Sequence, residues 1–174
     1  GKRYLLYFGT LNVLKGLLSI AEILHDLLSL YSDLYFVFVG KDARFNGGFS
    51  VVDHLYSSAQ EHKNKIVYLG TQKHEKLYPI ISHAEAVVLP SRIDNFPNAC
   101  LESMANERIV IGTRGTSFEQ LIEDGQNGFL CEADNATSLL ASVQKALEIS
   151  PEIKRIMGAA AKRRVEELKP EIVA

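Results

Sequence analysis

The sequence lacks an excess of charge of either sign. Its 19 Lys and Arg residues are balanced by 21 Asp and Glu residues, which gives a formal net charge of -2 at pH 7. This balance removes the general electrostatic attraction to nucleic acid or anionic lipid that a strongly basic domain has. We therefore expect no nucleic-acid partner, and any bound anion must be held by a local site.

Long apolar runs and cysteine are also scarce. The longest hydrophobic stretch, residues 17–30, is broken by charged residues, and no signal-peptide pattern opens the chain. Cys100 and Cys131 lie in apolar settings without CxxC or Cys/His spacing. We interpret them as reduced core thiols, which fits a cytoplasmic protein.

Metal-ligand spacing is a further absence. The histidines show no spacing to one another or to cysteine that is typical of a metal site, so none is expected. They are His25, His54, His62, His74 and His83.

Six apolar runs alternate with segments able to form helices. The chain has 174 residues and 47% hydrophobic composition, enough for one domain that buries roughly 70% of its unfolded surface. Continuous apolar strands separated by helices predict a parallel sheet covered on both faces, an α/β Rossmann-like, doubly wound fold. The predicted strands are 4–8, 35–39, 66–69, 86–89, 109–111 and 128–131.

The helices are predicted from apolar residues at three- and four-residue steps. The predicted ranges are 17–31, 51–62, 74–83, 97–106, 117–123, 136–148 and 151–168. Gly and Asn clusters at 46–48 and 124–128 indicate turns. We expect one domain over residues 1–174. Because Gly1 directly precedes a predicted strand, we expect this domain to be cut from a larger protein.

The first predicted strand leads into a loop that runs from Gly9 to Gly16. A glycine at a strand end lets a ligand approach the backbone, and Lys15 adds a charge at the positive end of the following helix. Phosphate is favoured there. The pattern is neither GxGxxG nor a P-loop, and by itself it is more typical of a solvated surface lysine.

A second loop places two carboxylates, Asp94 and Glu102, around a helix start at Pro97. The free amides near Asn98 and Ala99 would point toward the carboxyl edge of the sheet, where open parallel sheets bind ligands. Either carboxylate alone could simply cap the helix. The combination favours a ligand site.

The orientation of this helix follows from its apolar positions. Leu101, Met104 and Ala105 should form its buried stripe, which leaves Glu102 on a flank that can face the crevice. Carboxylates suit sugars because each can accept two hydroxyl hydrogen bonds.

At these residues the chain resembles the C-terminal, nucleotide-sugar-binding domain of group 1 (family 4) retaining glycosyltransferases. Those enzymes have the GT-B fold, in which two Rossmann-like domains face each other across a cleft. The family pairs two acids with seven residues between them, as Asp94 and Glu102 are here, before a segment like Ser103-Met104-Ala105. Further short matches follow in order at 9–16, 38–40, 67–70, 89–91, 112–119 and 124–130.

The resemblance implies a role for each part of the site. Glu102 would bind the ribose hydroxyls of a nucleotide-sugar donor, Asp94 the hydroxyls of the transferred sugar, and Lys15 the diphosphate. Lys15 and Asp94 are the implied catalytic residues. The implied donor-binding residues are Gly9, Thr10, Lys15, Gly70, Thr71, Asp94, Asn95, Phe96, Asn98, Ala99 and Glu102.

The implied reaction transfers a sugar from a nucleotide diphosphate to a carbohydrate or glycolipid acceptor with retained anomeric configuration. No cofactor is implied, and the absence of Asp-x-Asp agrees with metal independence. The family's N-terminal acceptor domain is absent from this chain, so we expect donor binding without turnover. Polysaccharide or glycolipid assembly at the inner face of a membrane is the implied setting, with peripheral association of the full-length protein.

Two residues depart from the family pattern. Thr10 stands where the family usually has arginine, and the loss of that phosphate contact would cost about 1.5–3 kcal/mol. Arg92 or Arg114 could substitute. Asp94 stands where Glu is more usual. These departures leave two alternatives open: a non-catalytic nucleotide-binding or regulatory module of GT-B ancestry, or a nucleotide-sugar epimerase domain.

Overall fold

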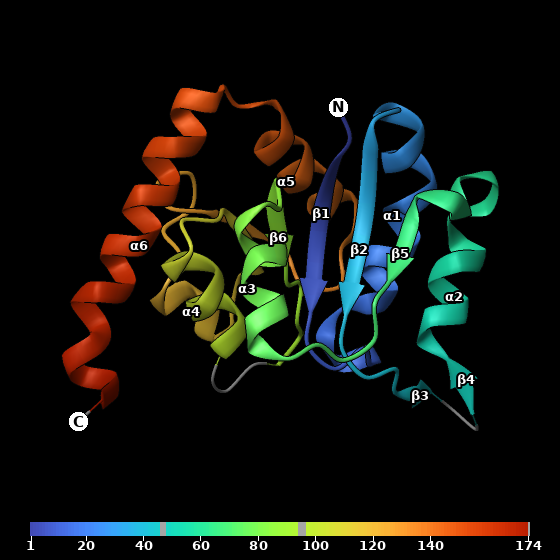
Figure 1. The fold of residues 1–174 in the computed structure, drawn as a ribbon, viewed down its shortest axis with the longest axis horizontal. Coiled ribbons are helices and arrows are strands. Elements are labelled where there is room, and N and C mark those ends of the chain that lie inside the picture. The colour runs from blue at the N-terminus through green and yellow to red at the C-terminus, as the bar shows by residue number, and fades with distance from the viewer. Residues whose placement is uncertain (46–47, 94–96, 174) are drawn as a thin grey trace.

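Six parallel strands form the central sheet of the computed structural model, which describes residues 1–45, 48–93 and 97–173 (Figure 1). The sheet has the order β5-β2-β1-β6-β7-β8, and every neighbouring pair is parallel. The strands are β1 (Arg3–Phe8), β2 (Leu34–Val39), β5 (Ile66–Tyr68), β6 (Ala86–Val88), β7 (Val110–Thr113) and β8 (Phe129–Cys131). The predicted Rossmann-like sheet is confirmed.

Helices cover both faces of this sheet. In Figure 1, α3 and α4 lie in front of the strands, α1 lies behind them, and α6 extends along one side. α1 packs against α2 and α5, while α6 packs against α4. The helices are α1 (Leu17–Leu30), α2 (Val51–Ser58), α3 (His74–Ser82), α4 (Asn98–Ala105), α5 (Ala136–Glu148) and α6 (Pro151–Val173). Short 3-10 helices are η1 (Val13–Lys15), η2 (Gln60–Lys65) and η3 (Ser117–Gln120).

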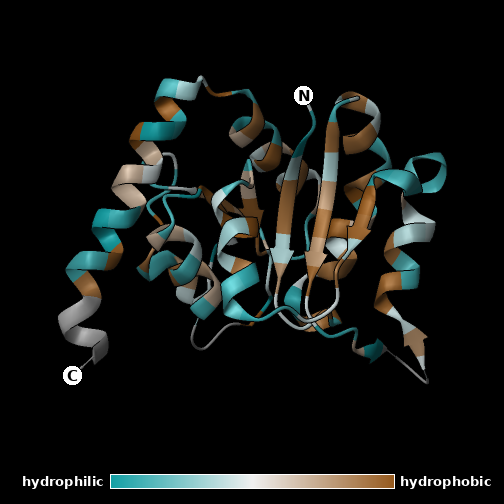
Figure 2. Cartoon of the chain, viewed as in Figure 1, coloured by the Kyte–Doolittle hydropathy of each residue, from teal (hydrophilic) through white to brown (hydrophobic). Residues whose placement is uncertain are grey.

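The core lies on both faces of the central strands. Leu5 and Leu6, which point to opposite faces of β1, are both fully buried, and Figure 2 shows apolar strands between amphipathic helices. Cys100 and Cys131 are buried and are not joined in a disulfide, as predicted. Burial raises the pKa of Cys131 to about 11, so this thiol stays protonated near neutral pH.

Two predicted helices differ from the structure. The helix predicted over 51–62 ends at Ser58 because Gln60 has a φ of 53°, which an α-helix does not accommodate, and the chain continues as η2. The segment predicted over 117–123 forms only the 3-10 turn η3, confined between Thr116 and the turn that starts at Asp124. A short hairpin of β3 (Arg44–Phe45) and β4 (Phe49–Ser50) flanks the predicted turn at 46–48.

The strand order reverses between β1 and β6, and the loops that follow these two strands are locked together. The Arg92 amide donates a 3.0 Å hydrogen bond to the Leu14 carbonyl. Gly16 has a φ of +80°, and a Cβ atom at this position would lie 2.0 Å from the Pro90 carbonyl oxygen. Only glycine therefore allows the two loops to approach this closely.

Replacing Gly16 with alanine should destabilise the fold more than replacing Gly125, which has the same φ of +80° but no atom within 4 Å of the place a Cβ would occupy. Both Gly16→Ala and Gly125→Ala carry the left-handed penalty of about 1–2 kcal/mol. Only Gly16→Ala adds a clash with backbone, for which a further loss of roughly 1–3 kcal/mol is expected. Urea denaturation of both variants measures the difference, and equal losses would contradict the close approach.

Candidate functional site

A hollow of about 210 Å³ opens at the carboxyl edge of the sheet, between the ends of β1 and β6 and the start of α4. Ligands of open α/β sheets bind at this position, where the strand order reverses. The lining residues are Tyr7, Phe8, Gly9, Thr10, Lys15, Leu89, Ser91, Asn98 and Ala99.

Lys15 reaches this hollow from η1. The Asn12 side chain caps η1 by accepting a 3.0 Å hydrogen bond from the Lys15 amide. The Tyr7 hydroxyl donates to the Thr10 carbonyl at 2.6 Å, which fixes the start of the same loop. The backbone of Lys15 is thus held by local hydrogen bonds at a defined place next to the strand end.

A second hollow of about 390 Å³ adjoins the first and shares Phe8, Gly9, Thr10 and Ala99 with it. Its remaining lining residues come from β2, from the start of α3 and from α4. They are Val39, Gly40, Lys41, Thr71, Gln72, His74, Leu77 and Glu102. Lys15 and Glu102, which are far apart in the sequence, therefore face two hollows with common walls.

Glu102 carries a buried carboxylate oxygen, Oε2, that has no hydrogen-bond partner among the described residues. A buried polar atom without a partner costs about 1–3 kcal/mol. Buried polar atoms without partners are rare in folded proteins, and each calls for an explanation such as a functional role. Glu102 as a residue lines the second hollow.

The buried stripe of α4 differs from the prediction. Cys100, Ser103 and Met104 are its buried residues, whereas Leu101 is only half-buried and Ala105 is exposed. The Ser103 hydroxyl donates to the Ala99 carbonyl at 2.7 Å, so a polar side chain can occupy the buried face. Glu102 lies beside this stripe and lines the second hollow.

The start of α4 presents backbone amides to the first hollow. Pro97 is the N-cap residue, one position before the helix, and its carbonyl accepts the first intrahelical bond from the Leu101 amide at 3.0 Å. The amides of Asn98 and Ala99 precede that bond and are free of the helical ladder. Both residues line the hollow, so they can meet an anion there.

The structure brings most of the predicted site residues together. Gly9, Thr10, Lys15, Thr71, Asn98, Ala99 and Glu102 line the two hollows. Gly70 lies at the rim, where its carbonyl accepts a 2.9 Å hydrogen bond from the Gly40 amide. Three further predicted residues, Asp94, Asn95 and Phe96, lie outside the described residues.

The two arginines proposed as substitutes for the missing cation have other partners. Arg92 forms an ion pair with Asp134. Arg114 forms ion pairs with Asp124 and Glu132. Neither arginine is among the residues that line the two hollows. The expectation that one of them replaces the family's arginine at Thr10 is therefore not supported.

Lys41, Gln72 and His74 line the second hollow but were missed from the sequence. Lys41 follows Gly40 at the end of β2 in the same way that Thr10 follows Gly9 at the end of β1. This shared pattern, a polar residue directly after the glycine that ends a strand, could have identified Lys41 from the sequence. Lys41 is exposed and adds a second positive charge to this edge of the sheet.

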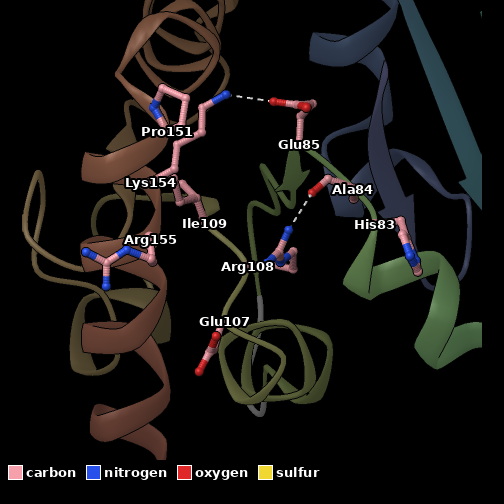
Figure 3. Close-up of a pocket in the computed structure, with 9 residues that line it drawn as sticks. All are labelled: His83, Ala84, Glu85, Glu107, Arg108, Ile109, Pro151, Lys154 and Arg155. Carbon is pink, nitrogen blue, oxygen red and sulfur yellow. Dashed lines mark hydrogen bonds and ion pairs between the residues drawn. The ribbon is translucent and has the colours of Figure 1, made fainter. Parts of the chain in front are cut away.

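A separate hollow of about 280 Å³ lies at the opposite, amino edge of β6 and β7 (Figure 3). Two of its basic residues have partners there. Lys154 pairs with Glu85 at 2.7 Å, and Arg108 donates to the Ala84 carbonyl at 3.3 Å. Because this hollow lies away from the carboxyl edge of the sheet, we do not assign it to ligand binding.

Solved structures with the same fold include glycosyltransferase domains. The C-terminal domain of a group 1 family glycosyl transferase from Francisella tularensis matches 96% of this chain and 86% of that domain, with a TM-score of 0.84 and 19% identity. Sucrose-phosphate synthase from Thermosynechococcus elongatus matches 96% of this chain and 41% of that protein, with a TM-score of 0.79 and 21% identity. The fold is thus that of a GT-B C-terminal domain.

The sequence places the chain in a family. Residues 1–164 match the model of the group 1 glycosyl transferases, and the chain belongs to this family. It is 25% identical to glycogen synthase of Mycobacterium tuberculosis over 100% of this chain and 41% of that enzyme. It is 26% identical to alpha-D-kanosaminyltransferase of Streptomyces kanamyceticus over 88% of this chain and 38% of that enzyme. The chain therefore spans about two fifths of these relatives.

The unpartnered oxygen predicts a stability effect at Glu102. Replacing the carboxylate with an apolar side chain of similar length, Glu102→Met, removes the buried orphan and should raise the free energy of unfolding by about 1 kcal/mol. Glu166→Met, at an exposed position of α6, is the control and should have little effect. Denaturant titration of both variants measures this, and a marked loss of stability in Glu102→Met would contradict the assignment.

Proposed function

We propose that this chain is the donor-binding domain of a glycosyltransferase that moves a sugar from a nucleotide diphosphate sugar to an acceptor, with retained anomeric configuration and without a metal. The observation that carries the proposal is Glu102, which lines a hollow adjoining that of Lys15 and carries a buried Oε2 atom without a partner among the described residues. Membership of the group 1 family supports the reaction class.

Glu102 would bind the ribose of the donor. A carboxylate oxygen is acceptor-only and can take hydrogen bonds from neighbouring hydroxyls, which a ribose presents as a pair. Binding would then supply the partner that Oε2 lacks in the described residues. The desolvation of this oxygen is already complete before the ligand arrives, so less is lost on binding.

The diphosphate would lie between Lys15 and the start of α4. Lys15 supplies a full positive charge, while the amides of Asn98 and Ala99 and the helix dipole supply partial ones. Negative charge grows on the leaving diphosphate during transfer, and preorganised donors stabilise it. Lys15 thereby acts as a catalytic residue, and Lys41 adds a second positive charge in the adjoining hollow.

The remaining donor contacts follow the family resemblance. Gly70 and Thr71 lie at the rim of the second hollow and would border the base. Asp94 would bind the hydroxyls of the transferred sugar, and Asn95 and Phe96 would add further donor contacts.

The acceptor would be bound by an N-terminal domain. The chain corresponds to about 41% of the glycogen synthase it matches, and GT-B enzymes place their active site between two such domains. The whole enzyme would transfer a hexosyl group in polysaccharide or glycolipid synthesis on the cytoplasmic side of a membrane. No helix within the described ranges is long and apolar enough to cross a membrane.

Donor binding tests the proposal directly. Calorimetric titration of the chain with UDP-, GDP- and ADP-sugars should show binding of an intact donor. Lys15→Ala and Glu102→Ala should each weaken it about 10- to 150-fold, because each removes a charge-assisted contact worth about 1.5–3 kcal/mol. Lys162→Ala, whose side chain pairs with Glu107 on the surface, is the charge-matched control. Undiminished binding in both site variants would overturn the assignment.

A non-catalytic nucleotide-binding module is the second candidate. Thr10 occupies the place of the usual arginine, and both Arg92 and Arg114 are paired elsewhere. This candidate predicts that none of the UDP-, GDP- and ADP-sugars binds, or that a free nucleotide binds as tightly as an intact nucleotide sugar. The transferase instead predicts that the sugar itself adds affinity.

The chain by itself should bind the donor but not turn it over, because the acceptor side of the cleft is not part of it. Chromatography of a donor incubated with the chain should show no transfer and no product beyond uncatalysed hydrolysis. Because we propose that the donor is bound without a metal, EDTA should leave the affinity for the donor unchanged. Measurable transfer by the chain alone, or loss of affinity in EDTA, would contradict these expectations.

A further inference from the structure

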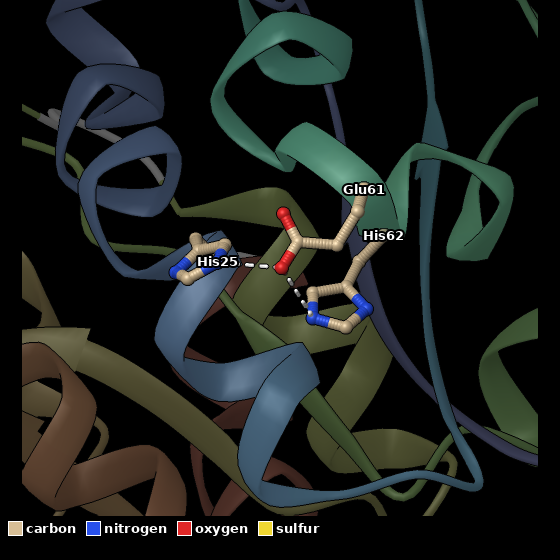
Figure 4. A group of neighbouring side chains, drawn as sticks. All are labelled: His25, Glu61 and His62. Carbon is tan, nitrogen blue, oxygen red and sulfur yellow. Dashed lines mark hydrogen bonds and ion pairs between the residues drawn. The ribbon is translucent and has the colours of Figure 1, made fainter.

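Three potential metal ligands, none of which lines the first or the second hollow, converge on the surface of the domain (Figure 4). His25 lies on α1, while Glu61 and His62 lie on η2. Their ligand atoms all lie within 4.8 Å of one another. Spacing along the chain gave no sign of this group, because 36 residues separate His25 from Glu61.

The distances are close to those of a tetrahedral zinc site. The His25 Nε2 atom lies 3.1 Å from Oε1 of Glu61, and the His62 Nε2 atom lies 3.8 Å from the same oxygen. Zinc bonds of 2.0–2.2 Å place neighbouring ligand atoms about 3.3 Å apart. Small side-chain rotations would therefore bring all three atoms into range of one ion.

The surroundings of His25 orient its ring. The Nδ1 atom lies 3.3 Å from the Asp26 carboxylate, on the side of the ring away from Glu61. Metal-bound histidines commonly use the other ring nitrogen in this way, because a carboxylate fixes the tautomer and makes the ligand nitrogen more basic. This arrangement leaves Nε2 of His25 directed at the cluster.

Charge and access also suit a cation. The Glu61 and Asp26 carboxylates lie 3.1 and 3.3 Å from the two ring nitrogens of His25, so negative charge surrounds the place an ion would occupy. The side chains of His25, His62 and Glu61 are 34%, 22% and 64% exposed, which lets an ion enter from solvent. The Ser29 hydroxyl lies 2.8 Å from Nε2 of His62, and this contact would yield to the metal.

We propose that His25, Glu61 and His62 form a Zn²⁺ site that joins α1 to η2. The Nε2 atoms of both histidines and one oxygen of Glu61 are the protein ligands, and water completes the coordination. The bound His62 carries its remaining proton on Nδ1. Because the ligands come from two packed elements, the metal ties η2 to α1 and stabilises the folded state by preferential binding.

Zinc titration of the metal-free chain tests this site without any nucleotide sugar, so its outcome is independent of the proposed function. Calorimetry with ZnCl₂ near neutral pH should give one saturable site per chain, and the melting temperature should rise with zinc concentration. His25→Ala and His62→Ala should each weaken binding by at least about tenfold. His83→Ala removes an exposed histidine elsewhere and should bind zinc like the unchanged chain.

Glu61→Gln provides a second test that does not depend on the histidine variants being folded. Glu61 is largely exposed, so its replacement should not disturb the core. This variant should also bind zinc more weakly while its circular dichroism stays unchanged. The proposal fails if no saturable zinc binding occurs. It also fails if well-folded His25→Ala, His62→Ala and Glu61→Gln all bind zinc as the unchanged chain does, since the cluster is then only a hydrogen-bonded ion pair.

Discussion

The close backbone contact between Gly16 and Pro90 sets the geometry on which the candidate site depends. It brings the loop after β1 against the loop after β6, where the strand order reverses. Lys15 immediately precedes this contact, and α4 begins eight residues beyond Pro90. A charged side chain and a row of free amides are therefore held side by side by packing of the main chain, with no need for a ligand to assemble them.

Glu102 illustrates how such a site is maintained at some cost to the resting protein. Its buried oxygen is unpartnered among the described residues, which costs the folded state about 1–3 kcal/mol. Cys100 and Met104, on the same helix, are fully buried and anchor α4 to the sheet. Rigid apolar packing on one side of α4 thus keeps a polar group directed toward the other side.

The sequence was sufficient to predict the sheet, because its six predicted strands are apolar runs that alternate with segments able to form helices. It also predicted the loops that hold Lys15 and Glu102, since residues at the carboxyl ends of parallel strands must gather at one edge. It did not predict that α2 stops at Ser58, because Gln60 adopts a positive φ of 53°, which glutamine does not signal as glycine or asparagine would.

Contacts between side chains from distant segments could not be predicted from the sequence. Asp134 lies 42 residues from Arg92, and Arg114 pairs with both Asp124, 10 residues away, and the more distant Glu132, so no local pattern directs those side chains. The burial of Ser103 in α4 depends on a hydrogen bond within the helix, which an apolar-stripe rule ignores. Lys41 is different, because its position directly after a strand-ending glycine could have predicted it as a site residue.

Gly9, whose main chain packs closely against Gly40, is part of the wall that the two hollows share. A Cβ at Gly40 would lie 1.8 Å from the Gly9 carbonyl oxygen, and the Gly40 amide is already bonded to Gly70. Side chains cannot be added here without separating β1 from β2. Evolutionary or engineered changes in ligand preference must therefore occur around the periphery, at positions such as Thr71 and Gln72, while the depth of the crevice stays constant.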